Sequence, residues 1–338
     1  MQRSKTKVTM DDIARRLNIS KNPVSLALGK KKGVSDALRK QIEDAAREMN
    51  YGGFAPENIK SRCVVSIVPE YIHNDAYFYS DIFWSIEKES KKNNYVSIMT
   101  GITRGAEAEL DLPQTPPEMD VAGYFVIGIV NPAYVVKLLE TGRPVVAVDI
   151  RHHRVPVRSV TSSNLSGGFA ATMHLIESGH TQIGFIGPVY AAQSIYERWC
   201  GFKQAMDFSG VELKGDYDIT GNKNEFKLFD AVEALEPLVD SVESLPTAWF
   251  CAGDRIAISL INILTRRKIK IPEEISVIGF DDIPMAQMVF PALTTMRVDR
   301  RLMGKLAFNA LIEPRYDFRR NINLSSVLVE RDSVRKIK

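Results

Sequence analysis

Long apolar runs and cysteine are scarce in this sequence. No stretch of the 338 residues approaches the roughly 20 apolar residues that a membrane-spanning helix needs. Residues 1–7 lack the apolar segment of a secretory signal. The three cysteines, Cys63, Cys200 and Cys251, are far apart and form no Cys-x-x-Cys pair, which argues against a disulfide framework or a cysteine-ligated metal site. We therefore expect a cytoplasmic protein with reduced thiols and no contact with a membrane.

Histidine and the common catalytic motifs are also sparse. The five histidines contain no pair at the helical spacing of a metal site, so we expect no bound metal. The sequence has no Gly-x-x-x-x-Gly-Lys phosphate loop, no Gly-x-Gly-x-x-Gly turn and no Gly-x-Ser-x-Gly nucleophile elbow. Gly184 and Gly187 alone are too sparse to cradle a dinucleotide. These absences favour a protein that is not an enzyme and that carries no cofactor.

What the sequence does have is segregated charge. Residues 1–62 carry 14 Lys and Arg against 7 Asp and Glu, whereas the rest of the chain carries 30 against 34. A basic segment on a mildly acidic body is typical of nucleic-acid binding, because neutralising phosphates releases counterions. The basic segment also has helical apolar periodicity, which distinguishes it from a solvated basic tail.

Three short helices are predicted within residues 9–50. Thr9 is a helix N-cap, and Asp12 stands three residues later as a short capping-box partner. Ser20 is the N-cap of a second helix, and Ser35 is the N-cap of a third. Because the first two helices are separated by only three or four residues, they form a helix-turn-helix motif.

The order of these signals resembles the DNA-binding headpiece of the LacI/GalR family of transcription regulators. The matching segments are Val-Thr-Met-Asp-Asp-Ile-Ala at 8–14, Ile-Ser-Lys-Asn-Pro-Val-Ser at 19–25 and Asn-Tyr at 50–51. The resemblance implies that the second helix reads base edges in the major groove with Lys21, Asn22 and Leu26. It implies phosphate contacts at Thr9, Ser20 and Ser25. Lysine reads guanine, asparagine reads adenine, and leucine contacts a thymine methyl group.

The resemblance weakens after the headpiece. Family members usually continue with an Ala-Arg-x-Leu helix whose leucine enters the central minor groove. Residues 52–62 contain no such signature: Lys60 stands at the leucine position, and Ile59 is the nearest apolar substitute. Gly52 and Gly53 favour a flexible turn at this point. We expect Ile59 to be the DNA contact of this hinge and operator bending to be weaker than in typical members.

From Val64 onward, short β-branched runs alternate with helical patterns, which predicts βαβ units with parallel sheets. Strands are expected at 64–68, 95–99, 124–127, 145–148, 183–186, 248–251 and 277–280. Helices are expected at 81–92, 167–178, 197–209, 225–239 and 256–267. The segment 101–120, interrupted by prolines, leaves room for only a short helix.

The family resemblance implies how these elements are organised. The fold class is α/β, with a three-helix helix-turn-helix headpiece followed by two Rossmann-like subdomains that resemble periplasmic sugar-binding proteins. We expect the headpiece at 1–50, a hinge at 51–63 and an effector-binding and dimerisation domain at 64–338. Its N-subdomain comprises about 64–162 and 292–322, and its C-subdomain about 163–291 and 323–338. The chain is expected to cross between them near Ser162, Pro291 and Ile322.

Three aspartates, Asp149, Asp254 and Asp281, follow predicted apolar strands. Because ligands bind beyond the carboxyl ends of the strands in open α/β sheets, these carboxylates are candidates for accepting hydrogen bonds from sugar hydroxyls. Asp254 is explained equally well as the cap of a following helix. The other effector candidates are Arg198, as a donor to ring or carboxyl oxygens, and Tyr77 and Phe78, as cover for a sugar face.

The whole pattern favours an effector-responsive repressor that binds a palindromic operator as a homodimer. The last residues contain no leucine heptad, so we expect no tetramer. The effector is expected to be a sugar or sugar derivative. Its identity does not follow from known members, because Gly253 stands where relatives often have asparagine. Two alternatives stay open: a regulator without a small effector that docks a phosphoprotein, and a sugar-processing enzyme with a basic head. Absence of a specific operator would exclude both regulators, and turnover of a bound sugar would favour the enzyme.

Overall fold

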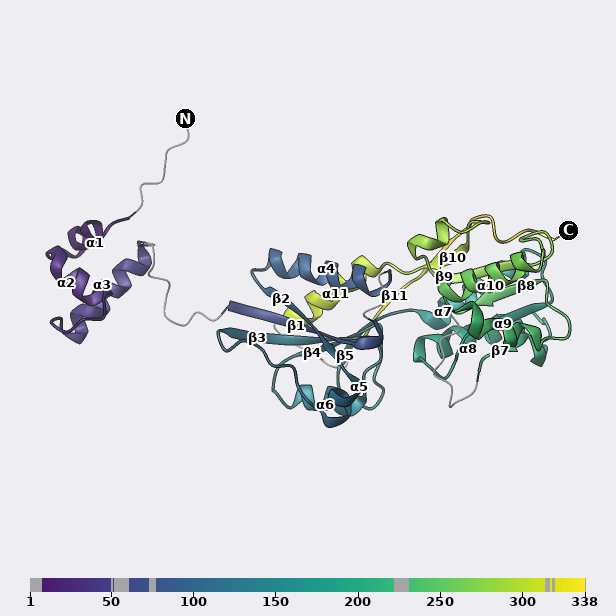
Figure 1. Ribbon diagram of the computed structural model, residues 1–338, viewed down its shortest axis with the longest axis horizontal. Coiled ribbons are helices and arrows are strands. Elements are labelled where there is room, and N and C mark those ends of the chain that lie inside the picture. Colours follow the sequence, from purple (N-terminus) through teal and green to yellow (C-terminus); the bar gives the residue numbers. More distant parts are fainter. Residues whose placement is uncertain are drawn as a thin grey trace, which may run out of the picture. The chain divides into compact units, whose positions relative to one another are not determined.

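The chain consists of two compact units, Met1–Ser61 and Arg62–Lys338. The computed structural model describes residues 8–49, 51, 61–72, 77–221, 231–313, 317 and 320–337. The described residues of the first unit form three helices, and those of the second unit form two sheets with covering helices (Figure 1). No helix within the described ranges is long and apolar enough to cross a membrane.

The first unit is a three-helix headpiece. Its helices are α1 (Met10–Leu17), α2 (Lys21–Leu28) and α3 (Asp36–Glu48), which confirms the three predicted helices. The Asp12 carboxylate accepts hydrogen bonds from the Thr9 N–H at 2.8 Å and from the Thr9 hydroxyl at 2.7 Å, which fixes the start of α1. The Ser35 hydroxyl accepts from the Leu38 N–H at 3.3 Å at the start of α3. The buried faces of the three helices close a small apolar core of Ile13, Ala14, Val24, Ala27, Ile42, Ala45 and Ala46.

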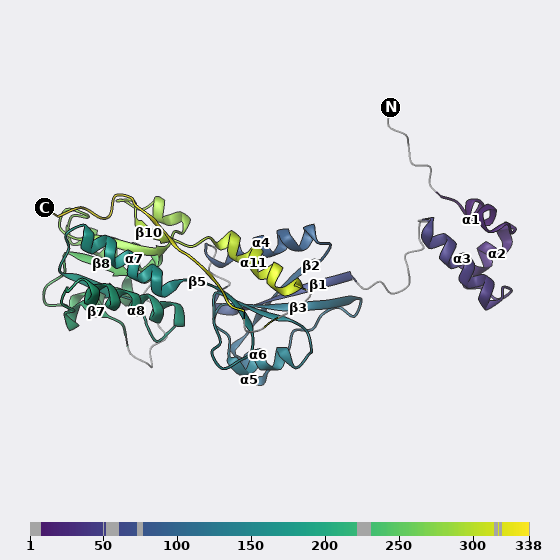
Figure 2. The ribbon, with the colours of Figure 1, turned by 180° about the vertical axis from the view of Figure 1, so that it is seen from behind.

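A six-stranded sheet, with strand order β11-β5-β4-β3-β1-β2, forms one half of the second unit. Its strands are β1 (Ser61–Pro69), β2 (Val96–Ile102), β3 (Met119–Ile127), β4 (Val145–Val148), β5 (Arg158–Ser162) and β11 (Ile322–Leu324). Helices α4 (Tyr79–Lys92) and α11 (Arg300–Ile312) lie on one face, and α5 (Arg104–Glu109) and α6 (Pro132–Leu139) lie on the other (Figure 1 and Figure 2). Val64 and Phe125 join one core while Val65 and Val126 join another, because successive side chains of a strand point to opposite faces. Both faces are therefore buried.

A second six-stranded sheet has strand order β12-β10-β9-β8-β6-β7. Its strands are β6 (Ile183–Ile186), β7 (Asp218–Ile219), β8 (Ala248–Cys251), β9 (Ser276–Asp281), β10 (Thr294–Arg297) and β12 (Val327–Val329). Neighbouring strands are parallel except that β12 runs antiparallel to β10. Two helix pairs pack together, α7 (Asn164–Glu177) with α8 (Gln193–Phe208) and α9 (Val232–Asp240) with α10 (Asp254–Arg266). Single 3₁₀ turns occupy η1 (Glu70–Ile72), η2 (Gly215–Tyr217) and η3 (Pro284–Gln287).

The chain passes three times between the two sheets: from β5 to α7, from β10 to α11, and from β11 to β12. The second passage differs from the expected one. Strand β10 pairs in parallel with β9, with Thr294 opposite Ile278, and so belongs to the second sheet. The chain therefore crosses after Arg297 rather than near Pro291, and the expected subdomain boundary at 291–292 is wrong. The short, threonine-rich β10 gave no apolar run that would have placed it in the sheet.

The seven predicted strands are all present, and β4, β6 and β8 have the predicted bounds. Sequence patterns missed β5, whose polar residues are nevertheless buried, and the helices α6 and α11. The helix expected at 225–239 is represented by α9, which begins at Val232, while residues 222–230 lie outside the described ranges. The α/β fold class is thus confirmed.

Candidate functional sites

Helix α2 exposes several of the predicted DNA-contact side chains. Lys21, Asn22 and Ser25 are exposed, while the core-facing residues of the same helix are buried. Ser20, directly before the helix, is also exposed, and Leu26 is half-buried. The structure therefore brings five of the predicted contacts onto one short segment, with Lys21 and Asn22 at the N-terminal end of α2.

Two neighbouring carboxylates at the start of α1 have different partners. Asp11 Oδ2 lies 2.8 Å from Lys21 Nζ, and this hydrogen bond raises the pKa of Lys21. Asp12 instead accepts both donors of Thr9, and the hydrogen bond from the Thr9 hydroxyl is the main cause that lowers the pKa of Asp12. Because the Thr9 hydroxyl proton points to Asp12, the predicted phosphate contact at Thr9 requires that this hydrogen bond be exchanged.

A run of three exposed lysines, Lys30, Lys31 and Lys32, follows α2. Arg39 of α3 donates to the Ala27 carbonyl at 2.8 Å and to the Lys31 carbonyl at 2.6 Å, which holds the start of this loop against the headpiece. The loop was not among the predicted DNA contacts, although its charge run was visible in the sequence. The predicted hinge contact Ile59 lies outside the described residues.

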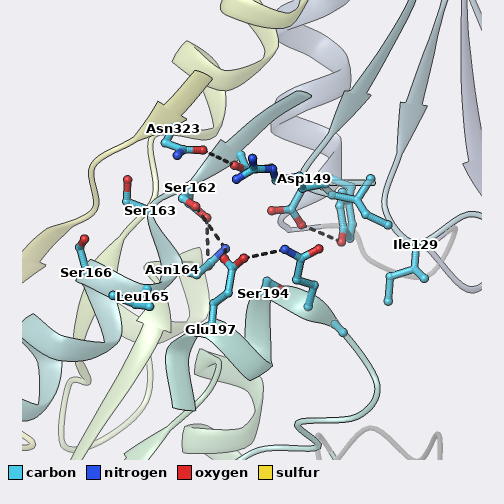
Figure 3. A pocket seen from close by; sticks show the side chains of 16 residues that line it. Ile129, Asp149, Ser162, Ser163, Asn164, Leu165, Ser166, Ser194, Glu197 and Asn323 are labelled. Atoms are coloured by element: carbon cyan, nitrogen blue, oxygen red, sulfur yellow. Dashed lines mark hydrogen bonds between the residues drawn. The ribbon is translucent and has the colours of Figure 1, made fainter. Parts of the chain in front are cut away.

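The second unit contains two adjoining cavities, of about 240 Å³ and about 200 Å³. Each is lined from both sheets. Figure 3 shows Asp149 and Ile129, which follow strands of the first sheet, on one side of the larger cavity, and Asn164, Ser194 and Glu197 on the other. The cavities lie beyond the carboxyl ends of parallel strands, which is where ligands bind in open α/β sheets. Side chains from both subdomains thus meet at one place, which we call the cleft.

The larger cavity is rich in hydrogen-bond acceptors. Asp149 has a left-handed backbone, with φ of 60°, and its carboxylate accepts from the Tyr79 hydroxyl at 3.0 Å. Glu197 accepts from the Gln193 side-chain amide at 2.6 Å and from Asn164 Nδ2 at 3.4 Å. Carboxylates from both subdomains therefore line one small polar cavity (Figure 3).

Two glycines allow α7 and α8 to approach closely and so position Asn164 beside α8. A Cβ atom on Gly168 would collide with the Arg198 carbonyl, and one on Gly201 would collide with the Leu165 carbonyl. In both cases the colliding atom belongs to the backbone, which cannot move aside as the end of a flexible side chain can. Both positions therefore require glycine. The contact between these helices is the reason that Asn164 reaches Arg198.

Arg198 is buried, with 5% of its surface exposed, and its guanidinium is held by protein acceptors. Nε donates to Asn164 Oδ1 at 3.0 Å, Nη1 donates to the Ala252 carbonyl at 2.6 Å, and Nη2 lies 3.1 Å from Asp281 Oδ1. The guanidinium carbon also lies 3.8 Å from the centre of the Phe280 ring. The donors that we expected to meet a ligand's carboxyl oxygens are therefore already engaged inside the protein.

Asp254 does not line the cleft, contrary to the effector-binding role considered from sequence. It is fully buried at the start of α10, where Oδ2 accepts from the Ile283 N–H at 2.8 Å and Oδ1 accepts from the Thr295 hydroxyl at 2.5 Å. Burial raises the pKa of Asp254 well above its usual value. Its role is to tie α10 to β10 and to the segment just after β9, because a buried carboxyl must find donors.

The smaller cavity is more apolar. It is lined by Phe78, which is buried, and by Tyr77, which is exposed; their predicted role of covering a sugar face stays a prediction. Isoleucines from both subdomains complete its wall, including Ile72, Ile195 and Ile283. Asp281, in a left-handed backbone with φ of 110°, borders this cavity and holds Arg198. A ligand would therefore meet an acceptor-rich region and an apolar region side by side.

Comparison with known proteins gives this architecture a family. Residues 9–52 match the family described as bacterial regulatory proteins, lacI family, and residues 172–334 match the periplasmic binding protein-like domain. The HTH-type transcriptional repressor PurR of Vibrio vulnificus (strain CMCP6) is 29% identical over 335 residues, which cover 97% of this chain and 99% of that protein. The chain belongs to the LacI/GalR family.

Solved structures share the fold of this LacI/GalR-family chain over almost its whole length. The lac repressor dimer bound to operator and the anti-inducer ONPF has a TM-score of 0.68 at 20% identity, covering 98% of this chain and 100% of that one. The transcriptional regulator CelR-cellobiose complex has a TM-score of 0.68 at 22% identity, covering 96% of this chain and 99% of that one. The sequence-based assignment to effector-controlled DNA-binding regulators is confirmed at the level of the family.

Several cleft residues of this LacI/GalR-family chain were not predicted: Tyr79, Ile129, Asn164, Gln193 and Glu197. Two of them adjoin a residue that was singled out. Glu197 directly precedes Arg198, and Tyr79 follows Phe78. The missing signal was orientation, because only the packing of α8 against α7 decides that Glu197 and Arg198 both reach the cleft.

Proposed function

We propose that this protein is a repressor whose affinity for a palindromic operator is controlled by a small, uncharged, hydroxyl-rich effector bound in the cleft. The observation that carries the proposal is that the cleft is lined from both subdomains, by Asp149 and Tyr79 on one side and by Asn164 and Glu197 on the other. A ligand that contacts both sides favours one arrangement of the subdomains over others, and this is the differential binding that allosteric control requires.

The chemistry of the cleft supports a carbohydrate. Carboxylates and amides accept from and donate to hydroxyl groups, and the neighbouring apolar wall fits a ring face. The cellobiose complex of CelR, whose fold this chain shares, is a precedent for such a ligand in that protein. The buried cation of the cleft, Arg198, is already paired with Asp281, so a phosphate or carboxylate on the effector would have to pair with the exposed Arg151 or Arg255 rather than with a buried counter-charge.

The DNA-binding half of the proposal rests on the exposed face of α2. A homodimer would present two such helices to the two halves of a palindromic site, since the symmetry of the operator mirrors that of the protein. Lys21 and Asn22 are proposed as base readers, and Ser20, Ser25 and the lysines after α2 as phosphate contacts. The proposal places the protein in the cytoplasm, together with the DNA that it regulates.

The test is a selection of duplexes from a random library by the full-length protein, followed by titration of the recovered operator. We expect a sequence with two-fold symmetry. Small-molecule extracts are then divided on an anion-exchange resin, and the uncharged flow-through is expected to change operator affinity. Failure to enrich any sequence would contradict the repressor, and an active fraction confined to the retained anions would contradict the uncharged effector.

A matched pair of variants locates the effector. Asp149→Asn removes a cleft carboxylate and is expected to abolish the thermal shift that the active fraction produces. Glu140→Gln removes an exposed carboxylate just after α6, outside the cleft, and should leave that shift intact. Equal responses of the two variants would place the ligand elsewhere. Chemical conversion of the bound compound, followed by chromatography, would instead favour the sugar-processing alternative.

A further inference from the structure

Lys21, which we propose as a base reader, forms an ion pair with an aspartate. Lys21 Nζ lies 2.8 Å from Oδ2 of Asp11, which comes from α1 rather than from the recognition helix. The side chains are 59% and 53% exposed. Asp11 therefore accompanies Lys21 at the end of α2 that enters the major groove in helix-turn-helix proteins.

Stability does not account for this ion pair. An ion pair between two solvent-exposed side chains contributes little to folding. The neighbouring Asp12 shows what a structural carboxylate does in the same helix turn: it accepts both donors of Thr9 and fixes the start of α1. Within the described part of the headpiece, the ammonium of Lys21 is the hydrogen-bond partner of Asp11. The carboxylate is thus available for a role at the surface.

The donor and the acceptor of this ion pair complement the chemistry of one base pair. In the major groove guanine presents its O6 acceptor and cytosine its N4 donor, and the two atoms are hydrogen-bonded to each other at about 2.9 Å. A lysine nitrogen and a carboxylate oxygen 2.8 Å apart present, side by side, a donor for guanine O6 and an acceptor for the free N4 hydrogen of cytosine. We therefore expect that, where Lys21 donates to guanine O6, the Asp11 carboxylate accepts from the amino group of the paired cytosine.

We propose that Asp11 is a specificity-determining residue, which together with Lys21 selects a G·C pair in each half-site of the operator. The inference rests on the DNA-binding surface proposed above. A carboxylate near phosphates is repelled, so its presence at this surface is explained by a donor on the DNA and by the lysine that neutralises it. A T·A pair also places an acceptor, thymine O4, beside a donor, adenine N6. A lysine favours guanine because it can donate to both N7 and O6, whereas thymine has a methyl group beside O4.

The experiment compares duplexes selected by the full-length wild type, Asp11→Asn and Asp36→Asn. Asp36 is the matched control, since it is exposed, begins α3 and has the same charge. Loss of either carboxylate strengthens non-specific binding through charge alone. We expect that Asp11→Asn also relaxes the preference at one G·C position per half-site by about tenfold, whereas Asp36→Asn keeps the wild-type preference.

A double-mutant cycle tests whether the two residues act together. Lys21→Gln is expected to lose the same G·C preference, and adding Asp11→Asn should cause little further loss, because the two changes remove one shared interaction. Equal affinity gains with unchanged base preference for Asp11→Asn and Asp36→Asn would overturn the inference and leave Asp11 as a neutralising charge. Failure of the wild type to select any sequence would instead contradict the DNA-binding surface itself.

Discussion

The headpiece and the cleft are built from contacts of very different range along the chain. In the headpiece, Asp12 binds Thr9 three residues away, and Lys21 binds Asp11 ten residues away. In the cleft, Tyr79 binds Asp149 across 70 residues, and Arg198 binds the Ala252 carbonyl across 54. The headpiece contacts are exposed, and the Arg198 contact is buried. Substitutions in the cleft should therefore change stability as well as binding, whereas exposed headpiece residues should change mainly binding.

The largest expected effect is at Arg198. Arg198→Ala removes the donors that Arg198 supplies to Asp281, to Asn164 and to the Ala252 carbonyl, and removing one partner of a buried ion pair costs about 3–5 kcal/mol of unfolding free energy. Denaturant unfolding followed by tryptophan fluorescence measures this loss, because all three tryptophans, Trp84, Trp199 and Trp249, lie in the second unit. Arg151, exposed in the same cleft, supplies the control: Arg151→Ala should cost well under 1 kcal/mol. A similar loss in both variants would mean that burial does not distinguish them.

The second-largest effect is expected at Asp254, where the loss of unfolding free energy depends on pH. Asp254→Ala deprives two buried donors, on Ile283 and Thr295, of their acceptor, at a cost of about 2–3 kcal/mol. Because burial raises the pKa of Asp254, the folded state keeps its proton where the unfolded chain has lost it. The stability from this group is fully present below the unfolded pKa of about 3.9 and is lost as pH rises through the folded value.

The neutral amide of Asp254→Asn removes this titration. We expect its unfolding free energy to fall less than that of the wild type as pH is raised from about 4. Urea unfolding at a series of pH values gives the comparison. Parallel pH profiles for the two proteins would show that Asp254 does not titrate with a raised pKa in the folded state.

The three strand-end aspartates show where prediction from sequence succeeds and where it stops. All three follow an apolar run, so the strands before them were predictable from local residues. Asp149 and Asp281 have left-handed backbones and reach the cleft, while Asp254 begins a helix and turns into the interior. The pattern of residues fixes which elements form, because that depends on neighbours in sequence. Which side chain reaches the ligand depends on backbone direction and on strands such as β10 that the pattern did not reveal.

A smaller effect is expected where α7 and α8 meet. Gly201→Ala introduces a Cβ atom that collides with the Leu165 carbonyl, so the helices must separate, at a cost of about 2 kcal/mol. Separation also moves Asn164 away from Arg198, so effector affinity should fall as well. Gly215→Ala is the control, because a Cβ atom there meets nothing within 4 Å. If Gly201→Ala lowered the unfolding free energy but left effector affinity unchanged, the packing of α7 against α8 would not determine effector binding.

The smallest expected effect concerns two serines that begin helices of the headpiece. Ser35 and Ser20 are both N-caps, but only the Ser35 hydroxyl accepts a backbone hydrogen bond, from Leu38. Ser35→Ala should therefore cost about 1 kcal/mol of headpiece stability, measured by amide hydrogen exchange in α3. Ser20→Ala should leave exchange in α2 nearly unchanged and weaken operator binding, since its free hydroxyl can donate to a phosphate. If Ser20→Ala instead accelerated exchange in α2 while operator affinity held, Ser20 would be a structural cap, and the division between stabilising and DNA-contacting residues in the headpiece would have to be redrawn.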